Sequence, residues 1–222
     1  MARRLAPAAT PSPRLSIWDG VIEDTPVVLA VSGVGKVAAA LATQFVCDAF
    51  RARCVITFGL AGAIESDRQT GQLIVATGAV QHDMDARPLT VAKGVIPSLG
   101  EAILPADPKL SENLRRAAEQ VVEDPRVVSR GLILTGDQIV TSRAVRDGLL
   151  RDFPGGMCFD METAAVAQVA EQNGLPWGAL RMTSDSADES FDLDEVFSFG
   201  INTAADLFDQ VIRVFLKDGG TA

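Results

Sequence analysis

Short apolar runs that alternate with helical patterns constrain the fold of this chain more than any other feature of its sequence. Runs suited to buried strands occur at residues 27–31, 54–58, 73–80, 132–134 and 177–182. A first helix follows the first run, with an apolar stripe through Val37, Leu41, Phe45 and Ala49. Further helices are expected at 109–123, at 161–173, and around Ala204, Phe208, Ile212 and Phe215. The alternation predicts an α/β fold with a largely parallel sheet or an open barrel.

The length of 222 residues fits one domain, and no internal repeat or linker divides residues 1–222. The first fifteen residues are rich in proline and alanine, which resist regular structure, so we expect an atypical, poorly ordered start there.

The charge balance excludes several classes of function. With 20 Lys and Arg against 29 Asp and Glu, the net charge of −9 repels nucleic acid and anionic membranes.

No apolar run approaches the roughly 20 residues of a membrane span. Three cysteines and the single His82 form no metal-ligand spacing and no balanced disulfide set. We therefore expect a cytoplasmic protein with no metal and no organic cofactor.

Small and polar residues follow several of the expected strands, which is where ligands bind in such folds. They are residues 32–36, 59–63, 136–138 and 181–185. The turn at 32–36 lacks the spacing of a phosphate-binding loop, and Val37 stands where that loop needs a hydroxyl. Gly59 to Gly62 likewise lacks the order of a dinucleotide fingerprint, so neither segment alone predicts a nucleotide phosphate site.

Two acidic segments carry more chemistry. Asp160-Met161-Glu162 directly precedes a helix of small residues, and Arg181 to Asp185 follows a buried strand. Taken singly, the first is explained by capping of a helix N-terminus and the second by an ordinary polar loop.

Together, however, five motifs occur in the order and spacing of the nucleoside phosphorylase superfamily. They are residues 32–36, 59–63, 136–138, 160–162 and 181–185. Over residues 16–216 the chain most closely resembles the hydrolytic branch, the 5'-methylthioadenosine/S-adenosylhomocysteine nucleosidases. The resemblance implies a three-layer α/β/α fold around a central mixed, barrel-like sheet. It also implies a homodimer, a small nucleoside as substrate, and hydrolysis of 5'-modified adenosines to adenine and a ribose derivative.

The resemblance assigns roles that suit this chemistry, because breaking an N-glycosidic bond places positive charge on ribose and negative charge on the purine. Glu162 would hold the ribose hydroxyls and stabilise the cationic sugar, with Met161 packed beside it. Asp185 would donate to N7 of adenine, oriented by Ser184, and Arg181 would organise the carboxylates.

The remaining site residues are also implied by the resemblance and surround the same nucleoside. Ala61 and Gly62 would lie against the nucleoside, Val34 and Leu193 would close the 5' side, and Ile139 and Val140 would face the base. The same pocket is expected to include Leu60, Phe159 and Asp160.

Two departures from the family's pattern leave alternatives open for the reaction that this chain carries out. Thr57 and Leu60 replace the Arg and the hydroxyl residue expected of a phosphate site, which favours water over phosphate as nucleophile. A phosphorylase or a futalosine-type nucleosidase remains the first alternative. Nothing before Val27 resembles the buried strand with which the family opens, and the first glutamate is Glu23, so that strand and the family's general-base glutamate are missing. Either a segment upstream supplies them, or the sheet has an open edge and the protein binds nucleosides without turnover.

His82 is more often structural than catalytic in such a context. The segment 86–103 that follows it would reach the partner subunit.

Overall fold

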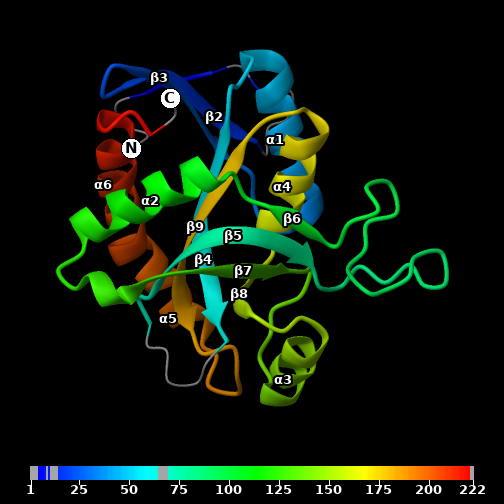
Figure 1. Ribbon diagram of the computed structural model, residues 1–222. Coiled ribbons are helices and arrows are strands. Elements are labelled where there is room, and N and C mark those ends of the chain that lie inside the picture. The colour runs from blue at the N-terminus through cyan, green and yellow to red at the C-terminus, as the bar shows by residue number, and fades with distance from the viewer. Residues whose placement is uncertain (1–4, 9, 11–14, 65–69, 221–222) are drawn as a thin grey trace.

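A closed barrel of five strands forms the centre of the computed structural model, which describes residues 5–8, 10, 15–64 and 70–220 (Figure 1). In order around the barrel they are β5 (Leu73–Gln81), β7 (Val128–Thr135), β8 (Gly156–Asp160), β4 (Val55–Ala63) and β9 (Trp177–Asp185). β9 pairs back with β5 and closes the ring, and the short β6 (Ile103–Pro105) extends β5 on the outside.

The barrel is mixed, and most of its paired residues run parallel. The pairs β5–β7, β7–β8 and β4–β9 are parallel, whereas β4–β8 and β5–β9 are antiparallel. The largely parallel pairing expected from the alternation of strands and helices is therefore present, although the barrel is closed rather than open. The mixed, barrel-like sheet implied by the family resemblance is confirmed.

Helices cover the barrel from two sides and give the expected three layers (Figure 1). α1 (Lys36–Phe50) and α4 (Thr163–Gln172) pack together on one side, and α2 (Pro108–Val121) and α6 (Ala205–Lys217) on the other. The largest apolar cluster joins the barrel to α2 and α6 through residues such as Leu73, Leu114, Leu180, Val211 and Phe215. Shorter elements not anticipated from the sequence are α3 (Arg143–Asp152), α5 (Leu193–Phe199), a 3-10 turn (Pro125–Val127) and a π-helical turn (Gly200–Ala204).

The buried face of α1 differs from the expected stripe. Val37 and Leu41 are 79% and 53% exposed, whereas Ala39, Ala42 and Thr43 are buried. Small side chains on that face allow α1 to approach α4 closely, with Ala39 packed against Ala165 and Val166. Close packing thus outweighs the larger apolar area of the valine and leucine, which remain on the surface.

A separate antiparallel sheet precedes α1. It contains β1 (Ala6–Pro7), β2 (Ser16–Ile22) and β3 (Thr25–Val31), with β2 and β3 joined at Glu23 and Asp24, both of positive φ. The expected strand at 27–31 is therefore present, but it is only half-buried, because among the described strands β2 alone pairs with it.

An open sheet edge, one of the two alternatives left by the sequence, lies between β3 and β4 in the described residues. Residues 55–60 of β4 pair with β9 alone, and the described residues place no strand between β4 and β3. Leu5 and Leu15 are buried in the apolar core, and residues 6–7 form a strand, so this part of the atypical start is ordered. The remaining positions of that expectation, 1–4, 9 and 11–14, lie outside the described residues.

Within the described ranges, no helix has the length and apolar character needed to cross a membrane.

Candidate active site

A cavity of about 1400 Å³ opens at the carboxyl ends of β4 and β9 and continues along the gap between β3 and β4. Every residue proposed from the sequence as part of the site lies on its wall. From the first half of the chain these are Val34, Leu60, Ala61 and Gly62, and from the second half Ile139, Val140, Phe159, Asp160, Met161, Glu162, Arg181, Ser184, Asp185 and Leu193. The fold therefore brings together segments that are far apart in the sequence.

Arg181 and Asp160 form a buried ion pair at the base of the cavity. The Arg181 side chain is 2% exposed, and its Nη2 lies 2.7 Å from Asp160 Oδ2. The Arg181 Nε–H donates to Thr163 Oγ1 at 2.9 Å. Asp160 also accepts hydrogen bonds from Thr135 Oγ1 at 2.5 Å and from the Thr163 N–H at 2.9 Å. Because protein donors already engage both carboxylate oxygens, Asp160 is suited to hold Arg181 rather than to reach a ligand.

The close approach of the β4 backbone to the guanidinium of Arg181 explains why residue 59 is a glycine. A Cβ atom on Gly59 would lie 1.8 Å from Arg181 Nη1. Thr57, two residues earlier on the same strand, accepts a weak hydrogen bond from Arg181 Nη2 at 3.4 Å. The Gly59 position thus gives Arg181 the room to lie flat against β4.

Glu162 is the carboxylate that remains available at this end of the cavity. It stands immediately before α4, and its Oε1 accepts a hydrogen bond from the Gly35 N–H at 2.9 Å. Its Oε2 lies 3.8 Å from Arg181 Nη2. Burial raises the pKa of Glu162 above its ordinary value, and Asp160 adds to the rise, although Arg181 and the Gly35 N–H oppose it. A half-buried carboxylate with one oxygen fixed and the other near a guanidinium can bind neighbouring hydroxyl groups.

Asp185 is placed by an irregularity in the sheet. The register between β4 and β9 shifts after Ala61–Thr183, so that Gly62 pairs with Asp185 and Ser184 is left over. Ser184 Oγ donates to Asp185 Oδ1 at 2.9 Å, and the Ala187 N–H donates to Oδ2 at 2.9 Å. A Cβ on Gly62 would approach Asp185 Oδ2 to 3.1 Å, so glycine gives this carboxyl access to the cavity.

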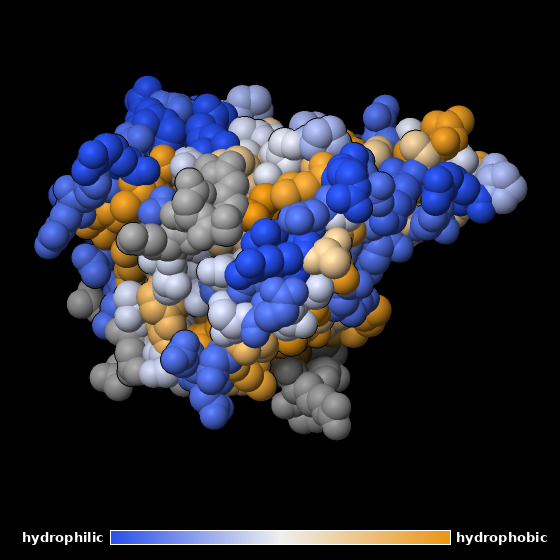
Figure 2. Space-filling model, turned by 90° about the horizontal axis from the view of Figure 1, so that it is seen from below, coloured by the Kyte–Doolittle hydropathy of each residue, from blue (hydrophilic) through white to orange (hydrophobic). Residues whose placement is uncertain are grey.

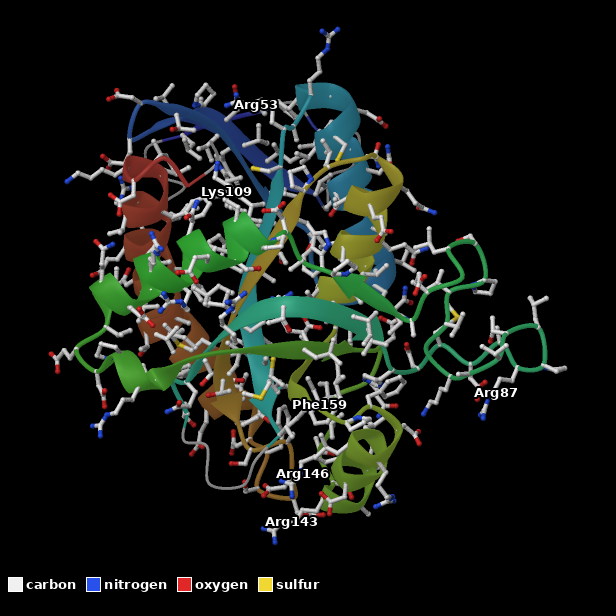
Figure 3. The ribbon with its side chains drawn as sticks, in the orientation of Figure 1. Arg53, Arg87, Lys109, Arg143, Arg146 and Phe159 are labelled. Carbon is white, nitrogen blue, oxygen red and sulfur yellow. The ribbon has the colours of Figure 1, made fainter. Side chains whose placement is uncertain are left out.

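The loop after β9 is held by α3. Arg146 donates to the Ser186 carbonyl at 3.3 Å, and the Arg143 N–H donates to Glu189 Oε1 at 3.0 Å. Figure 3 shows both arginines beside this loop, with Phe159 above them at the end of β8. The two contacts fix the segment that carries Asp185.

The apolar residues of the predicted site differ in exposure, and Leu60 and Met161 are intermediate. Val140 and Phe159 are buried, and the Phe159 ring meets the edge of the buried His82 ring at 6.1 Å between centroids. Val34, Ile139 and Leu193 are 74%, 53% and 48% exposed. These three therefore lie at the mouth of the cavity, where a ligand can cover them.

Two residues of this arrangement, Thr135 and Thr163, were not identified from the sequence, and the only signal for them is their position beside strand ends. Gly35 lies in the 32–36 motif, but the sequence did not indicate that its backbone N–H binds Glu162. The described residues contain no group of three or more His, Cys, Asp or Glu side chains that could hold a metal ion.

Comparison with known proteins agrees with this geometry. The nucleosidase for 5'-methylthioadenosine and S-adenosylhomocysteine of Oceanobacillus iheyensis is 31% identical over 199 residues, which cover 88% of this chain and 85% of that protein. The crystal structure of the Neisseria meningitidis nucleosidase of the same name, in complex with methylthio-immucillin-A, superposes with a TM-score of 0.88 at 32% identity. That match covers 98% of this chain and 91% of the other.

A mutant futalosine hydrolase of Helicobacter pylori is also similar, with a TM-score of 0.85 and 27% identity over 97% of this chain and 90% of that one. The family model described as "Phosphorylase superfamily" matches residues 6–217. The match spans the barrel and every segment that lines the cavity, and the chain belongs to the phosphorylase superfamily.

Proposed function

We propose that the protein hydrolyses the N-glycosidic bond of 5'-modified adenosines, such as methylthioadenosine and S-adenosylhomocysteine. The products are adenine and the corresponding ribose derivative. The observation that carries the proposal is the presence of two separately held carboxylates, Glu162 and Asp185, on the wall of one largely apolar cavity.

Each carboxylate suits one half of the reaction. The bond between C1' of ribose and N9 of adenine breaks, its electron pair goes to the purine, and the oxygen of water bonds to C1'. Glu162 binds the ribose hydroxyls and stabilises the positive charge on the sugar, with Met161 beside it. Asp185, oriented by Ser184, donates to N7 of the leaving adenine, and the proton lost by water balances the one gained by the base.

Water is favoured over phosphate as the nucleophile. Arg181 is the cation nearest this end of the cavity among the described lining residues, and Asp160 already engages it at 2.7 Å. Thr57 and Leu60 add no positive charge along β4. A phosphate dianion would therefore meet the Glu162 carboxylate without a free cation to offset the repulsion.

The test measures release of adenine from methylthioadenosine and S-adenosylhomocysteine, with and without phosphate. We expect release that does not depend on phosphate and falls at least about a hundredfold in Glu162→Gln and Asp185→Asn, since each variant removes a charge-assisted contact to the reacting groups. Glu171→Gln, at the exposed far end of α4, is the matched control and keeps full activity.

Futalosine joins the substrate panel because a futalosine hydrolase is among the similar structures. Preference for futalosine would make futalosine, rather than a 5'-modified adenosine, the assigned substrate. A strict requirement for phosphate would show that the reaction is phosphorolysis and not hydrolysis. Binding of adenine without release from any of the three nucleosides would contradict the proposed reaction and favour a nucleoside-binding protein.

We further propose that two copies associate as a homodimer in the cytoplasm. Support comes from the exposed Val37 and Leu41 on α1, and from the arm formed by residues 84–102, whose Leu89 and Val91 are 79% and 96% exposed. Figure 2 shows apolar surface at the tip of this arm. The Lys36–Asp83 ion pair brings α1 next to the base of the arm, so both apolar groups can belong to one interface.

The thiols of Cys47 and Cys54 form no disulfide, which suits a reducing compartment such as the cytoplasm.

A further inference from the structure

Three loops that end near the cavity are joined by the carboxylate of Asp83. The loops follow β3, β5 and β7, and Asp83 belongs to the second. Its Oδ1 lies 2.7 Å from Nζ of Lys36, the first residue of α1, at which the first loop ends. Its Oδ2 accepts a hydrogen bond from the Asp137 N–H in the third loop at 2.9 Å. The first and third loops also meet directly, because the Lys36 N–H donates to Asp137 Oδ1 at 2.8 Å.

Lys36 is held on a second side as well. Its Nζ donates to Gln81 Oε1 at 3.1 Å, and Gln81 Nε2 donates to Gln168 Oε1 of α4 at 2.7 Å. Burial opposes ionisation of Asp83, but hydrogen bonds from Lys36 and Asp137 outweigh it and keep the Asp83 pKa below its ordinary value. The side chains of Lys36 and Asp83 are 19% and 28% exposed, so water screens this pair only in part.

The connection to Glu162 runs through Gly35. The N–H of Gly35 donates to Glu162 Oε1 at 2.9 Å, and its own φ of +97° fixes the direction of the turn into α1. Lys36 is the next residue, so a change in the way its side chain and N–H are held moves the Gly35 N–H with it. A Cβ on Gly35 would stand 3.1 Å from Asp137 Oδ1, which shows how closely the loops meet.

We propose that Asp83 is a positioning residue for Glu162: it fixes Lys36 and Asp137, and so holds the Gly35 N–H on the carboxylate that binds ribose. The role of Glu162 rests on the proposed function, whereas the contacts from Asp83 to Gly35 do not. None of these contacts brings Asp83 to the wall of the cavity, so Asp83 acts through its neighbours.

The charge on Glu162 provides a readout that a merely structural role would not change. The groups that face Glu162 are Arg181 from β9, Asp160 from β8 and the Gly35 N–H from the loop before α1. Arg181 and Asp160 are fixed by contacts that do not involve Asp83. Loosening the loop therefore removes a hydrogen bond from ionised Glu162 while the nearby charges stay in place, and this raises its pKa further.

The experiment compares Asp83→Asn with Asp85→Asn as matched control. Asp85 is two residues away in the same segment, and within the described part of the chain its ion pair is with the exposed Arg87. We expect the acid limb of the kcat/KM profile to move to higher pH by about one unit in Asp83→Asn, because one hydrogen bond to a charged group corresponds to about that shift. Lys36→Met should move the limb in the same direction, and Asp83→Glu should restore part of the wild-type profile.

Titration of the Glu162 carboxyl by carbon-13 NMR, assigned with Glu162→Gln, separates this inference from the proposed function. A raised Glu162 pKa in Asp83→Asn and Lys36→Met supports the positioning role even if the wild type releases no adenine. An unchanged Glu162 pKa in both folded variants overturns it, whatever their activity. If Asp83→Asn fails to fold, Lys36→Met alone decides, since it keeps the backbone N–H that binds Asp137.

Discussion

Replacing Gly59 by alanine is the sharpest test of how the base of the cavity is built. The new Cβ would stand 1.8 Å from Arg181 Nη1 and 3.1 Å from its Cζ, so one of the two groups must move. Gly59 lies within β4, paired in register with Arg181 itself, which leaves the backbone little freedom. The guanidinium must therefore withdraw from its contacts with Asp160 and Thr163.

The cost follows from the burial of this ion pair. Separating a buried pair leaves an uncompensated charge and costs about 3–5 kcal/mol of the free energy of unfolding. At about 2–4 °C per kcal/mol for a chain of this size, even 3 kcal/mol lowers Tm by about 6–12 °C. We also expect kcat to fall more than about tenfold, since Arg181 fixes the position of the acidic groups beside the sugar. Calorimetry and the adenine-release assay measure the two effects.

Gly131→Ala provides a control with a similar overlap but a softer neighbour. Its Cβ would stand 1.9 Å from Met157 Cγ, which rotation of the methionine side chain can move away. It would also stand 2.9 Å from Met157 Cβ, a contact that a small shift of the backbone relieves. We expect a cost near the lower end of overpacking, about 1 kcal/mol, with activity unchanged. The reasoning is refuted if Gly59→Ala keeps both its Tm and its activity, or if Gly131→Ala loses as much of each.

Three further outcomes follow from the structure. Burial raises the pKa of Glu162, so activity should fall as the pH drops through this raised value. Because burial opposes the charge of Glu162, the Glu162→Gln variant should unfold at pH 7 at the same or a higher temperature than the wild type, despite its lost activity. A lower Tm would contradict this. Burial lowers the pKa of His82 in the folded protein below the ordinary histidine value of about 6.5. The unfolded chain therefore binds a proton at this residue more readily than the folded chain does, and stability is lost as the pH falls from about 6.5 towards the lowered pKa. His82→Gln should therefore show a smaller difference in Tm between pH 7.5 and pH 5, and an equal difference would exclude the imidazole as the cause. Val37→Glu should convert a dimer into a monomer in light scattering, and an unchanged mass would remove α1 from the interface.

The parts of the site that could be predicted are those encoded by contiguous residues. Met161-Glu162 and Ser184-Asp185 are short motifs at the ends of strands, where ligands bind in such folds, and they are among the motifs on which the family resemblance rests. Their exposure could not be predicted in the same way. Val34 and Ile139 lie at the mouth of the cavity because of how whole loops are placed, which no local pattern reports.

Tertiary contacts account for what the sequence did not indicate. The hairpin at Glu23 and Asp24 uses two residues of positive φ without the glycine or asparagine that usually marks such a turn. The face of α1 is decided by alanines that fit against α4, and a hydrophobic periodicity favours the larger side chains instead. The contacts of Asp83 join residues 47 and 54 positions apart, so they exist only once the barrel has formed.

The hydrogen bond between Gly35 and Glu162 has a consequence for how the molecule acquires activity. It joins residues 127 positions apart, and the ion pair beside it needs β9, the last strand of the barrel. Closing such long loops is slow compared with forming local helices, so the site is completed late in folding. A chain that has already formed its helices but not inserted β9 is expected to be compact and inactive. Recovery of adenine release during refolding would then lag behind recovery of the helical signal, which makes catalysis a reporter of the final folding step.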